Sequence, residues 1–342
     1  MKKLVSILLA ALLVLSCLPL IALADEAPIG TVTVSITDNG DREYLMDMFG
    51  FDEDEIEYAT PFGVIAEPTE VPVYAGESAA QAVVRLLEMK GITYTALGTA
   101  DLHGGFYLQT ISFTKDGEDV AGFGEYSITP DDDWAKYMSG WMIKFNNWFT
   151  SSGISDYEVE DGDIIEVLYT CGMGADIGND FSNPSAKITS LDISTGDLAP
   201  AFSADVKAYT LTVAADVDVV KIGYEMENYG AAVTVSAGDT SYRYLRAIPV
   251  ENGTVITLKS VFTAYDNTTY EPYTADETEI TITVVKPAPE EPTTQEPATE
   301  APAPSDGSKT VLDYITDVWN MFYNFFAQLW SRVSGFFGNL FK

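Results

Sequence analysis

Histidine and cysteine, which supply many catalytic and metal-binding groups, are scarce in this chain. The 342 residues include one histidine, His103, and two cysteines, Cys17 and Cys171. His103 has no second histidine and no nearby cysteine to work with, so we expect an exposed loop residue. Cys171 needs an activating base to act as a nucleophile, and its place at the end of a predicted strand favours a buried, inert thiol. These residues predict neither a catalytic residue nor a metal site.

The glycine-rich segment 172–178, with the sequence GMGADIG, follows a predicted strand, as a dinucleotide-binding loop does. Its third glycine comes one position later than in the Gly-x-Gly-x-x-Gly fingerprint of such loops. The next segment, 179–184, lacks a helical pattern, whereas the fingerprint needs a helix N-terminus to hold a pyrophosphate. We therefore interpret 172–178 as a flexible loop that leaves the strand.

Acidic clusters at 52–57 and 131–133 offer carboxylates for Ca²⁺, but neither has the alternating Asp-x-Asp-x-Asp-Gly pattern that wraps the ion. We interpret them as solvated loops. Paired carboxylates could also serve glycoside hydrolysis, yet nothing singles out one pair among 52 acidic residues. We therefore expect that the protein is not an enzyme, with a secreted hydrolase of unknown substrate as one alternative.

The charge balance excludes one class of partner. Eighteen basic residues face 52 acidic ones, and the formal net charge is −34. Such a chain has no basic surface to neutralise phosphates, so we expect no nucleic-acid partner. Purely electrostatic attachment to an anionic membrane is disfavoured for the same reason.

A group of aromatic residues is the best candidate for a ligand-binding surface. Trp141 and Phe145 alternate along a predicted strand, and this favours core packing. Trp148 and Phe149 come just after that strand, near a turn, where exposed aromatic residues often mark a binding surface. The candidate ligand-binding residues are Tyr107, Trp141, Phe145, Trp148 and Phe149.

The N-terminus has the features of a secretory signal peptide over residues 1–24. Two lysines precede an apolar run, and Ala22-Leu23-Ala24 provides a small-x-small cleavage site. An uncleaved membrane anchor and lipoprotein processing at Cys17 are the alternatives. Cleavage after Ala24 would leave one cysteine, so no intramolecular disulfide could form. The signal predicts an extracellular or cell-surface location.

Residues 25–180 have the pattern of an α+β domain. Short alternating or apolar segments predict strands at 31–36, 71–75, 106–113, 141–145 and 164–170. The segment 78–88 predicts a helix, because Ser78 and Gln81 have capping-box spacing and Gly91 follows as a stop. We expect this helix to pack across a sheet.

Three motifs in this region carry a resemblance. The segments GWMIKFN at 140–146, GISDY at 153–157 and DGDIIE at 161–166 resemble a domain-of-unknown-function family that is similar to the C-terminal β-domain of transcobalamin and intrinsic factor. The resemblance implies a β-grasp-like, ligand-binding fold and, as an alternative function, binding of a cobalamin-like corrinoid. This chain departs from the family in an acidic stretch at 38–67 and in Asn147, where the family usually has glycine.

Residues 186–286 have the pattern of a β-sandwich, with short alternating strands separated by turn residues. Strands are predicted at 209–213, 217–222, 232–235, 255–258 and 279–285. The sequence LDISTGDLAPAF at 191–202 resembles the start of the bacterial cadherin-like β-sandwich domain. The resemblance implies a stalk or adhesion module without catalytic residues.

The C-terminal part divides into a spacer and a helix. Residues 287–308 are rich in proline and acidic residues, which predicts an extended linker. Apolar residues then recur at helical spacing over 309–342, which predicts an amphipathic helix. We expect this helix to bind a membrane surface or a protein partner, with packing on the sandwich and self-association as alternatives. Its apolar face comprises Leu312, Ile315, Trp319, Phe322, Phe326, Leu329, Trp330, Val333, Phe336 and Leu340.

The sequence therefore predicts a mainly β, multidomain protein: an α+β (β-grasp-like) domain, a β-sandwich, a Pro-rich linker and a C-terminal amphipathic α-helix. We expect fragments 25–180 and 186–286 to fold independently, because each has its own apolar strands. The predicted function is that of an exported bacterial cell-surface binding or adhesion protein without a cofactor, with a small molecule or a glycan as ligand.

Overall fold

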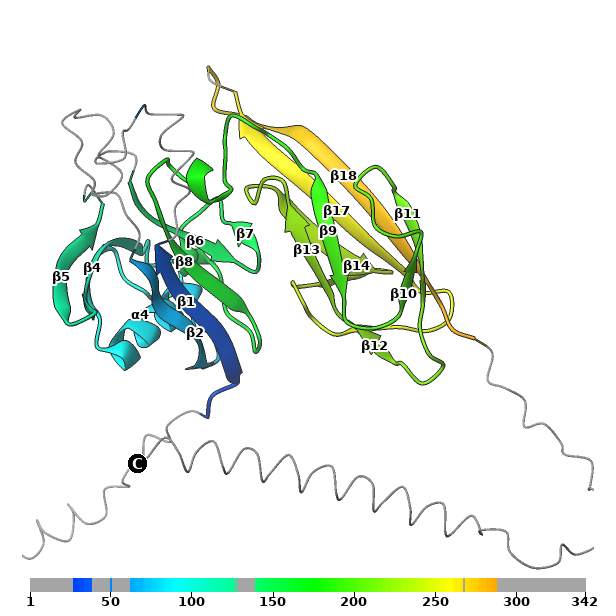
Figure 1. Cartoon of the computed structure of the whole chain (residues 1–342), viewed down its shortest axis with the longest axis horizontal. Coiled ribbons are helices and arrows are strands. Elements are labelled where there is room, and N and C mark those ends of the chain that lie inside the picture. Colours follow the sequence, from blue (N-terminus) through cyan, green and yellow to red (C-terminus); the bar gives the residue numbers. More distant parts are fainter. Residues whose placement is uncertain are drawn as a thin grey trace, which may run out of the picture. The chain divides into compact units, whose positions relative to one another are not determined.

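The computed structural model describes residues 27–38, 50, 62–125, 127, 139–266 and 268–287 (Figure 1). Their buried hydrophobic side chains form two clusters, one between Val32 and Cys171 and the other between Ala186 and Val284. We call residues 27–185 the N-terminal region and residues 186–287 the sandwich region. Strands dominate both, which confirms the predicted mainly β fold. The signal peptide, the acidic clusters, almost all of the linker and the C-terminal helix lie outside the described residues.

A five-stranded sheet forms the centre of the N-terminal region, in the order β2-β1-β8-β6-β7. β1 pairs in parallel with β8, whereas the other neighbours are antiparallel. The helix α4 (Ala79–Lys90) contacts β1, β2 and β8, which confirms the predicted packing of a helix across a sheet. The strands of this sheet are β1 (Gly30–Asp38), β2 (Gly63–Val73), β6 (Gly140–Phe145), β7 (Trp148–Phe149) and β8 (Ile164–Thr170).

A second sheet of this region has the order β3-β4-β5 and comprises β3 (Thr93–Leu97), β4 (Tyr107–Lys115) and β5 (Glu118–Gly124). The patterns predicted β4 but neither β3 nor β5. β2 begins at Gly63, so the last residues of the acidic stretch 38–67 belong to a strand. They do so because β2 pairs along the full length of β1, from Gly30 opposite Val73 to Asp38 opposite Gly63.

The caps of α4 are those that the sequence predicts. The Ser78 hydroxyl accepts a bond of 3.2 Å from the Gln81 amide, and the Gln81 side chain accepts one of 3.0 Å from the Ser78 amide. Gly91 ends the helix with φ of 67°, a left-handed conformation that glycine adopts without steric cost. The helix therefore buries a fixed face against the sheet, comprising Ala79, Ala80, Ala82, Val83, Leu86 and Leu87.

The sandwich region contains a six-stranded sheet in the order β10-β11-β18-β17-β14-β15, together with the pairs β13-β9 and β12-β16. Alternate residues of β17 and β18, such as Ile256, Leu258 and Ile282, are buried in the core that all these strands share. The strands are β9 (Ile188–Ile193), β10 (Asp197–Ala199), β11 (Ala208–Thr212), β12 (Val219–Val220), β13 (Ile222–Met226), β14 (Ala232–Ala237), β15 (Thr240–Tyr242), β16 (Ile248–Pro249), β17 (Val255–Tyr265) and β18 (Pro272–Val285).

One predicted strand of the sandwich region is divided. The segment 217–222 contributes to both β12 and β13, because β12 pairs with β16 whereas β13 pairs with β9. Lys221 lies between them. Its amide donates to the Ser194 hydroxyl, and its carbonyl accepts from the Ser194 amide. The chain thus changes its pairing partner at one residue, which an apolar pattern does not reveal.

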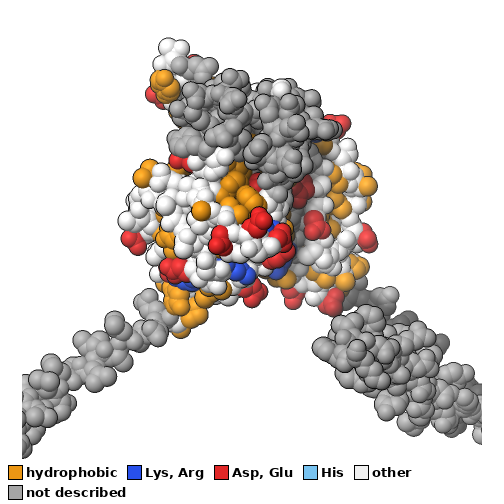
Figure 2. Space-filling model, turned by 60° about the vertical axis from the view of Figure 1, so that its left-hand side comes forward, with side chains coloured by type: hydrophobic (Ala, Val, Ile, Leu, Met, Phe, Trp, Pro, Cys, Tyr) orange, Lys and Arg blue, Asp and Glu red, His pale blue; other side chains and the backbone are white. Residues whose placement is uncertain are grey.

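The surface reflects the acidic composition. On the face that Figure 2 shows, acidic side chains are spread among many uncharged ones, and basic side chains are few. Among the described residues, no helix is both long enough and apolar enough to cross a membrane.

Candidate functional site

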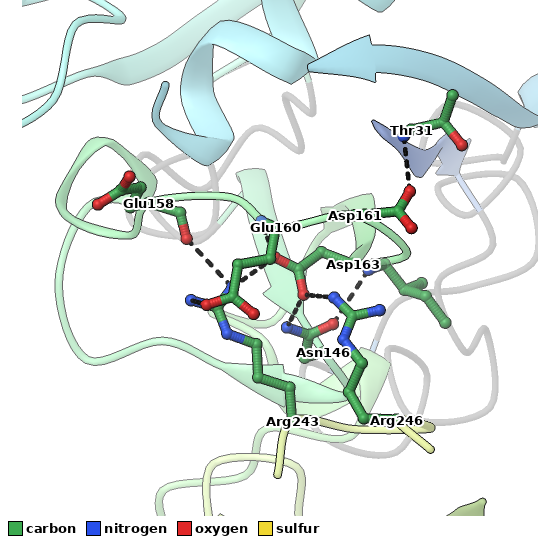
Figure 3. Close-up of polar contacts among 9 residues, drawn as sticks. Thr31, Asn146, Glu158, Glu160, Asp161, Asp163, Arg243 and Arg246 are labelled. Carbon is green, nitrogen blue, oxygen red and sulfur yellow. Dashed lines mark hydrogen bonds and ion pairs between the residues drawn. The ribbon is translucent and has the colours of Figure 1, made fainter. Parts of the chain in front are cut away.

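A tight turn at 160–163 brings the N-terminal region to the sandwich region. The Asp161 carboxylate accepts a hydrogen bond of 2.9 Å from the Thr31 amide, and the Gly162 amide donates one of 2.6 Å to the Thr31 carbonyl. Gly162 has φ of 78°, a left-handed conformation suited to glycine. The turn is therefore fixed to β1, and its last residue, Asp163, faces two arginines of the sandwich region (Figure 3).

The Asp163 carboxylate is fully buried and accepts four hydrogen bonds (Figure 3). Its Oδ1 accepts from Asn146 Nδ2 at 2.9 Å and from Arg246 Nη2 at 2.7 Å. Its Oδ2 accepts from the Glu160 amide at 2.8 Å and from Arg243 Nη1 at 2.5 Å. Four donors satisfy the lone pairs of a buried carboxylate, and two of them come from the other region of the chain. We call Asp163, Arg243, Arg246, Asn146 and Glu160 the junction network.

The hairpin between β6 and β7 makes a second set of contacts with the sandwich region. Its two-residue loop, Asn146 and Asn147, has φ of 51° and 65°, as a type I′ turn requires. Asn147 Nδ2 donates to the Tyr224 carbonyl at 2.6 Å, which a glycine could not do. Asparagine tolerates the left-handed conformation, so this departure from the resembled family supplies a bond across the junction.

The hairpin and the sandwich region enclose a groove of about 380 Å³, which we call the junction groove. Trp148 is fixed in it, because its Nε1 donates to the Gly230 carbonyl at 3.2 Å. Burial raises the pKa of the Tyr224 and Tyr244 phenols, which therefore stay neutral at physiological pH. The groove is lined by Phe145, Asn146, Trp148, Tyr157, Tyr224, Ala232, Val233, Thr234, Ser241, Tyr242, Arg243 and Tyr244.

The predicted ligand-binding residues line three hollows, and Trp148 and Phe149 come together in one of about 280 Å³ that also includes residues of the sandwich region, such as Tyr265. Phe145 and Trp148 line the junction groove, whereas Tyr107, Trp141 and Phe149 line a third hollow of about 230 Å³ in the N-terminal region. Trp141 and Phe145 are buried, which confirms their predicted core packing.

The predicted exposure of Phe149 is wrong, because only 3% of it is exposed. Its strand pairs with β6, and its amide donates to the Tyr229 carbonyl at 2.9 Å. Trp148, predicted with it, is half-buried against the sandwich region. The residues that close the groove from that side, including Tyr242 and Arg243, were not predicted. A signal for them exists: the segment SYRYLR at 241–246 holds two of the five arginines of the chain, interleaved with tyrosines.

The other chemical candidates take no part in the groove. His103 is exposed, as predicted, and its Nδ1 lies 3.4 Å from Asp156 Oδ1. Cys171 is buried, as predicted, and burial raises the pKa of its thiol. The segment 172–178, predicted as a flexible loop, contains the short 3-10 helix η3 (Ala175–Ile177), and the Asp176 carboxylate accepts bonds from the Cys171 and Gly172 amides. The described residues contain no cluster of groups suited to hold a metal ion.

Comparison with known families identifies one part of the chain. Residues 188–289 match the cadherin-like beta sandwich domain. This match confirms the resemblance predicted for the sandwich region, and a domain of this kind is compatible with an adhesion-type protein of the cell surface. No curated protein matches the chain.

Gly162 offers a test of the junction. A Cβ atom there would lie 2.3 Å from Arg246 Nη1, and the φ of 78° strains any L-residue. We expect Gly162→Ala to lower the free energy of unfolding by about 2–3 kcal/mol, measured by denaturant titration.

Gly76 is the matched control, because it has φ of 76° but no atom within 4 Å of its Cβ position. Gly76→Ala should cost only the backbone strain, about 1 kcal/mol. Equal losses in the two variants would show that Arg246 is not held against the turn.

Proposed function

We propose that this protein is an exported, non-catalytic cell-surface binding protein of a bacterium. In this proposal the N-terminal region and the cadherin-like sandwich together form the binding site. The observation that carries the proposal is the junction groove, whose walls come from both regions and are fixed by the junction network. Ligand sites often lie where two domains meet, with aromatic walls and a few polar groups.

The side chains of the groove support binding rather than catalysis. No carboxylate, imidazole or thiol lines it, and these are the groups that most often transfer protons or attack a substrate. The two groove residues with the strongest hydrogen-bonding groups, Asn146 and Arg243, are already bound to Asp163. A hydrolase would need a base beside Ser241 or Thr234, and no histidine or acid lines the groove.

The resemblance to the transcobalamin-type family belongs to this proposal. The β-grasp-like topology supports it, since a central parallel pair, β1 and β8, carries the helix α4 on one face. A corrinoid is a large macrocycle, and a groove of about 380 Å³ would cover only part of it. The geometry therefore favours a smaller ligand than a corrinoid.

The predicted signal peptide and the apolar face of 309–342 complete the proposal. The first would export the chain, and the second would add contact with a membrane surface or a protein partner. Binding through the groove and binding through this face are separate, so an experiment must distinguish them.

Co-sedimentation with isolated cell-wall sacculi of a Gram-positive-type bacterium tests the proposal. We expect the mature protein to bind, and a variant that ends at Ser308 to bind equally well. Tyr242→Ala should weaken this binding about tenfold, because it removes an aromatic wall of the groove.

The matched control is Tyr270→Ala, which alters a tyrosine that is 78% exposed in the turn between β17 and β18, outside the groove. This variant should bind like the unaltered protein. The proposal is wrong if the sacculi do not bind the protein, or if both tyrosine variants bind alike.

A further inference from the structure

We infer that the junction groove binds a neutral carbohydrate. This inference rests on the proposed function, because it names the ligand class of the same groove. It depends on three features of the groove: two pairs of aromatic rings, a set of unpaired hydroxyl groups, and charges that are compensated within the protein.

The aromatic rings form one pair on each side of the groove. Trp148 and Tyr157, from the N-terminal region, meet edge to face at 5.9 Å and 88°. Tyr224 and Tyr244, from the sandwich region, meet at 5.0 Å and 77°, and Tyr224, which is only 4% exposed, supports the Tyr244 ring rather than offering a surface of its own. These contacts hold the rings in place before a ligand arrives, so little conformational entropy remains to be lost on binding. The flat, apolar C–H face of a sugar ring matches such aromatic surfaces.

The unpaired hydroxyl groups lie on the sandwich side. Thr234, Ser241 and Tyr242 line the groove, and within the part of the chain that the structure describes their hydroxyls make no hydrogen bond. Ser241 lies opposite Ser236 in the β14–β15 pair, which places it on the same face of the sheet as Thr234, whereas Tyr242 lies opposite Val235 on the face that packs against the core. Each hydroxyl can donate and accept, and sugar hydroxyls have the same dual capacity.

The charges around the groove are paired with one another. Arg243 binds Asp163 at 2.5 Å and Glu160 at 3.0 Å, and Lys144 binds Glu166 at 2.9 Å. The Glu225 carboxylate accepts a hydrogen bond from the neutral Tyr229 hydroxyl and so keeps its negative charge, which disfavours an anionic ligand further. The groove therefore offers little net charge to an ion, and the formal net charge of −34 repels anions from the whole molecule. Together these features favour a ligand that is neutral, hydroxyl-rich and apolar on its ring faces.

Titration calorimetry on the full chain tests the inference with defined probes. The neutral probes are cellotetraose, chitotetraose and mannotetraose; tetragalacturonate is the anionic counterpart and cyanocobalamin the corrinoid. We expect at least one neutral tetrasaccharide to bind, and neither tetragalacturonate nor cyanocobalamin to bind as tightly. Tyr242→Phe keeps the ring and removes one hydroxyl, so it should weaken sugar binding about 3–10-fold.

Thr234→Val combined with Ser241→Ala should weaken binding by a similar factor, since it removes two hydroxyls from the same face. Tyr270→Phe, outside the groove, should change binding less than twofold, and circular dichroism should show that every variant is folded. Equal affinities of Tyr242→Phe and Tyr270→Phe would overturn the inference.

The remaining outcomes separate this inference from the proposed function. Suppose that Tyr242→Ala weakens binding to the sacculi but the protein binds none of the neutral tetrasaccharides. The carbohydrate inference is then wrong, and the binding function stands. The carbohydrate inference is also wrong, and the binding function again stands, if tetragalacturonate or cyanocobalamin binds more tightly than every neutral probe. If the sacculi do not bind the protein, the proposed function itself is wrong.

Discussion

Replacement of Asp163 by alanine should lower the free energy of unfolding by about 3–5 kcal/mol, the range found when one partner of a buried ion pair is removed. The carboxylate is fully buried and is the shared partner of Arg243 and Arg246. Its loss also leaves the Asn146 side chain and the Glu160 amide without their acceptor. Urea titration followed by circular dichroism measures the change.

An exposed ion pair of the same protein provides the control. Lys259 and Glu277 are 3.3 Å apart, with side chains that are 48% and 59% exposed. Glu277→Ala should cost less than about 1 kcal/mol, because water screens such a pair. If Asp163→Ala and Glu277→Ala lower the free energy of unfolding equally, the junction network does not stabilise the protein.

Trp141→Ala should lower the free energy of unfolding of the N-terminal region by about 3–5 kcal/mol, as truncation of large aromatic side chains in cores does. Trp141 is 6% exposed, and its ring packs edge-on against Phe123 at 5.7 Å and Tyr169 at 5.1 Å. Its Nε1 donates to the Phe123 carbonyl at 3.3 Å. The loss leaves a cavity beside the rings of Phe123 and Tyr169, and it leaves the Phe123 carbonyl without its donor.

Tyr107→Ala is the matched comparison, because Tyr107 lines the same hollow but is 43% exposed. We expect this change to cost about 1 kcal/mol or less, as most surface substitutions do. A comparable loss in the two variants would show that Trp141 does not pack as a core residue.

Local patterns predicted much of the fold of both regions. The cap of α4 was predictable because Ser78 and Gln81 interact within one turn of the chain. Strands such as β1 and β8 were predictable because they alternate or are apolar throughout. β7 was not, since two residues carry no period, and β3 was not, because four of its five residues are exposed.

The candidate site was less predictable than the fold, because it depends on contacts between distant residues. Asp163 and Arg246 are 83 positions apart, and no local pattern connects them. Phe149 was predicted to be exposed because it follows a strand near a turn, but the sandwich region and β6 bury it. The independent folding of fragments 25–180 and 186–286 stays a prediction. Separation would cost the first fragment the arginines that pair with Asp163, and it would cost the second fragment the Asp163 carboxylate.

The proposed binding site depends on the junction network, which must hold the N-terminal region against the sandwich region so that the junction groove keeps its walls. Backbone ¹⁵N relaxation of the full chain tests this requirement most directly, because it reports the rotational correlation time of each region. We expect a single correlation time for amides of β1 and β8 and for those of β17 and β18, and two different times in Asp163→Ala. Two different correlation times in the unaltered protein would contradict the proposal, because the groove would then have no fixed walls.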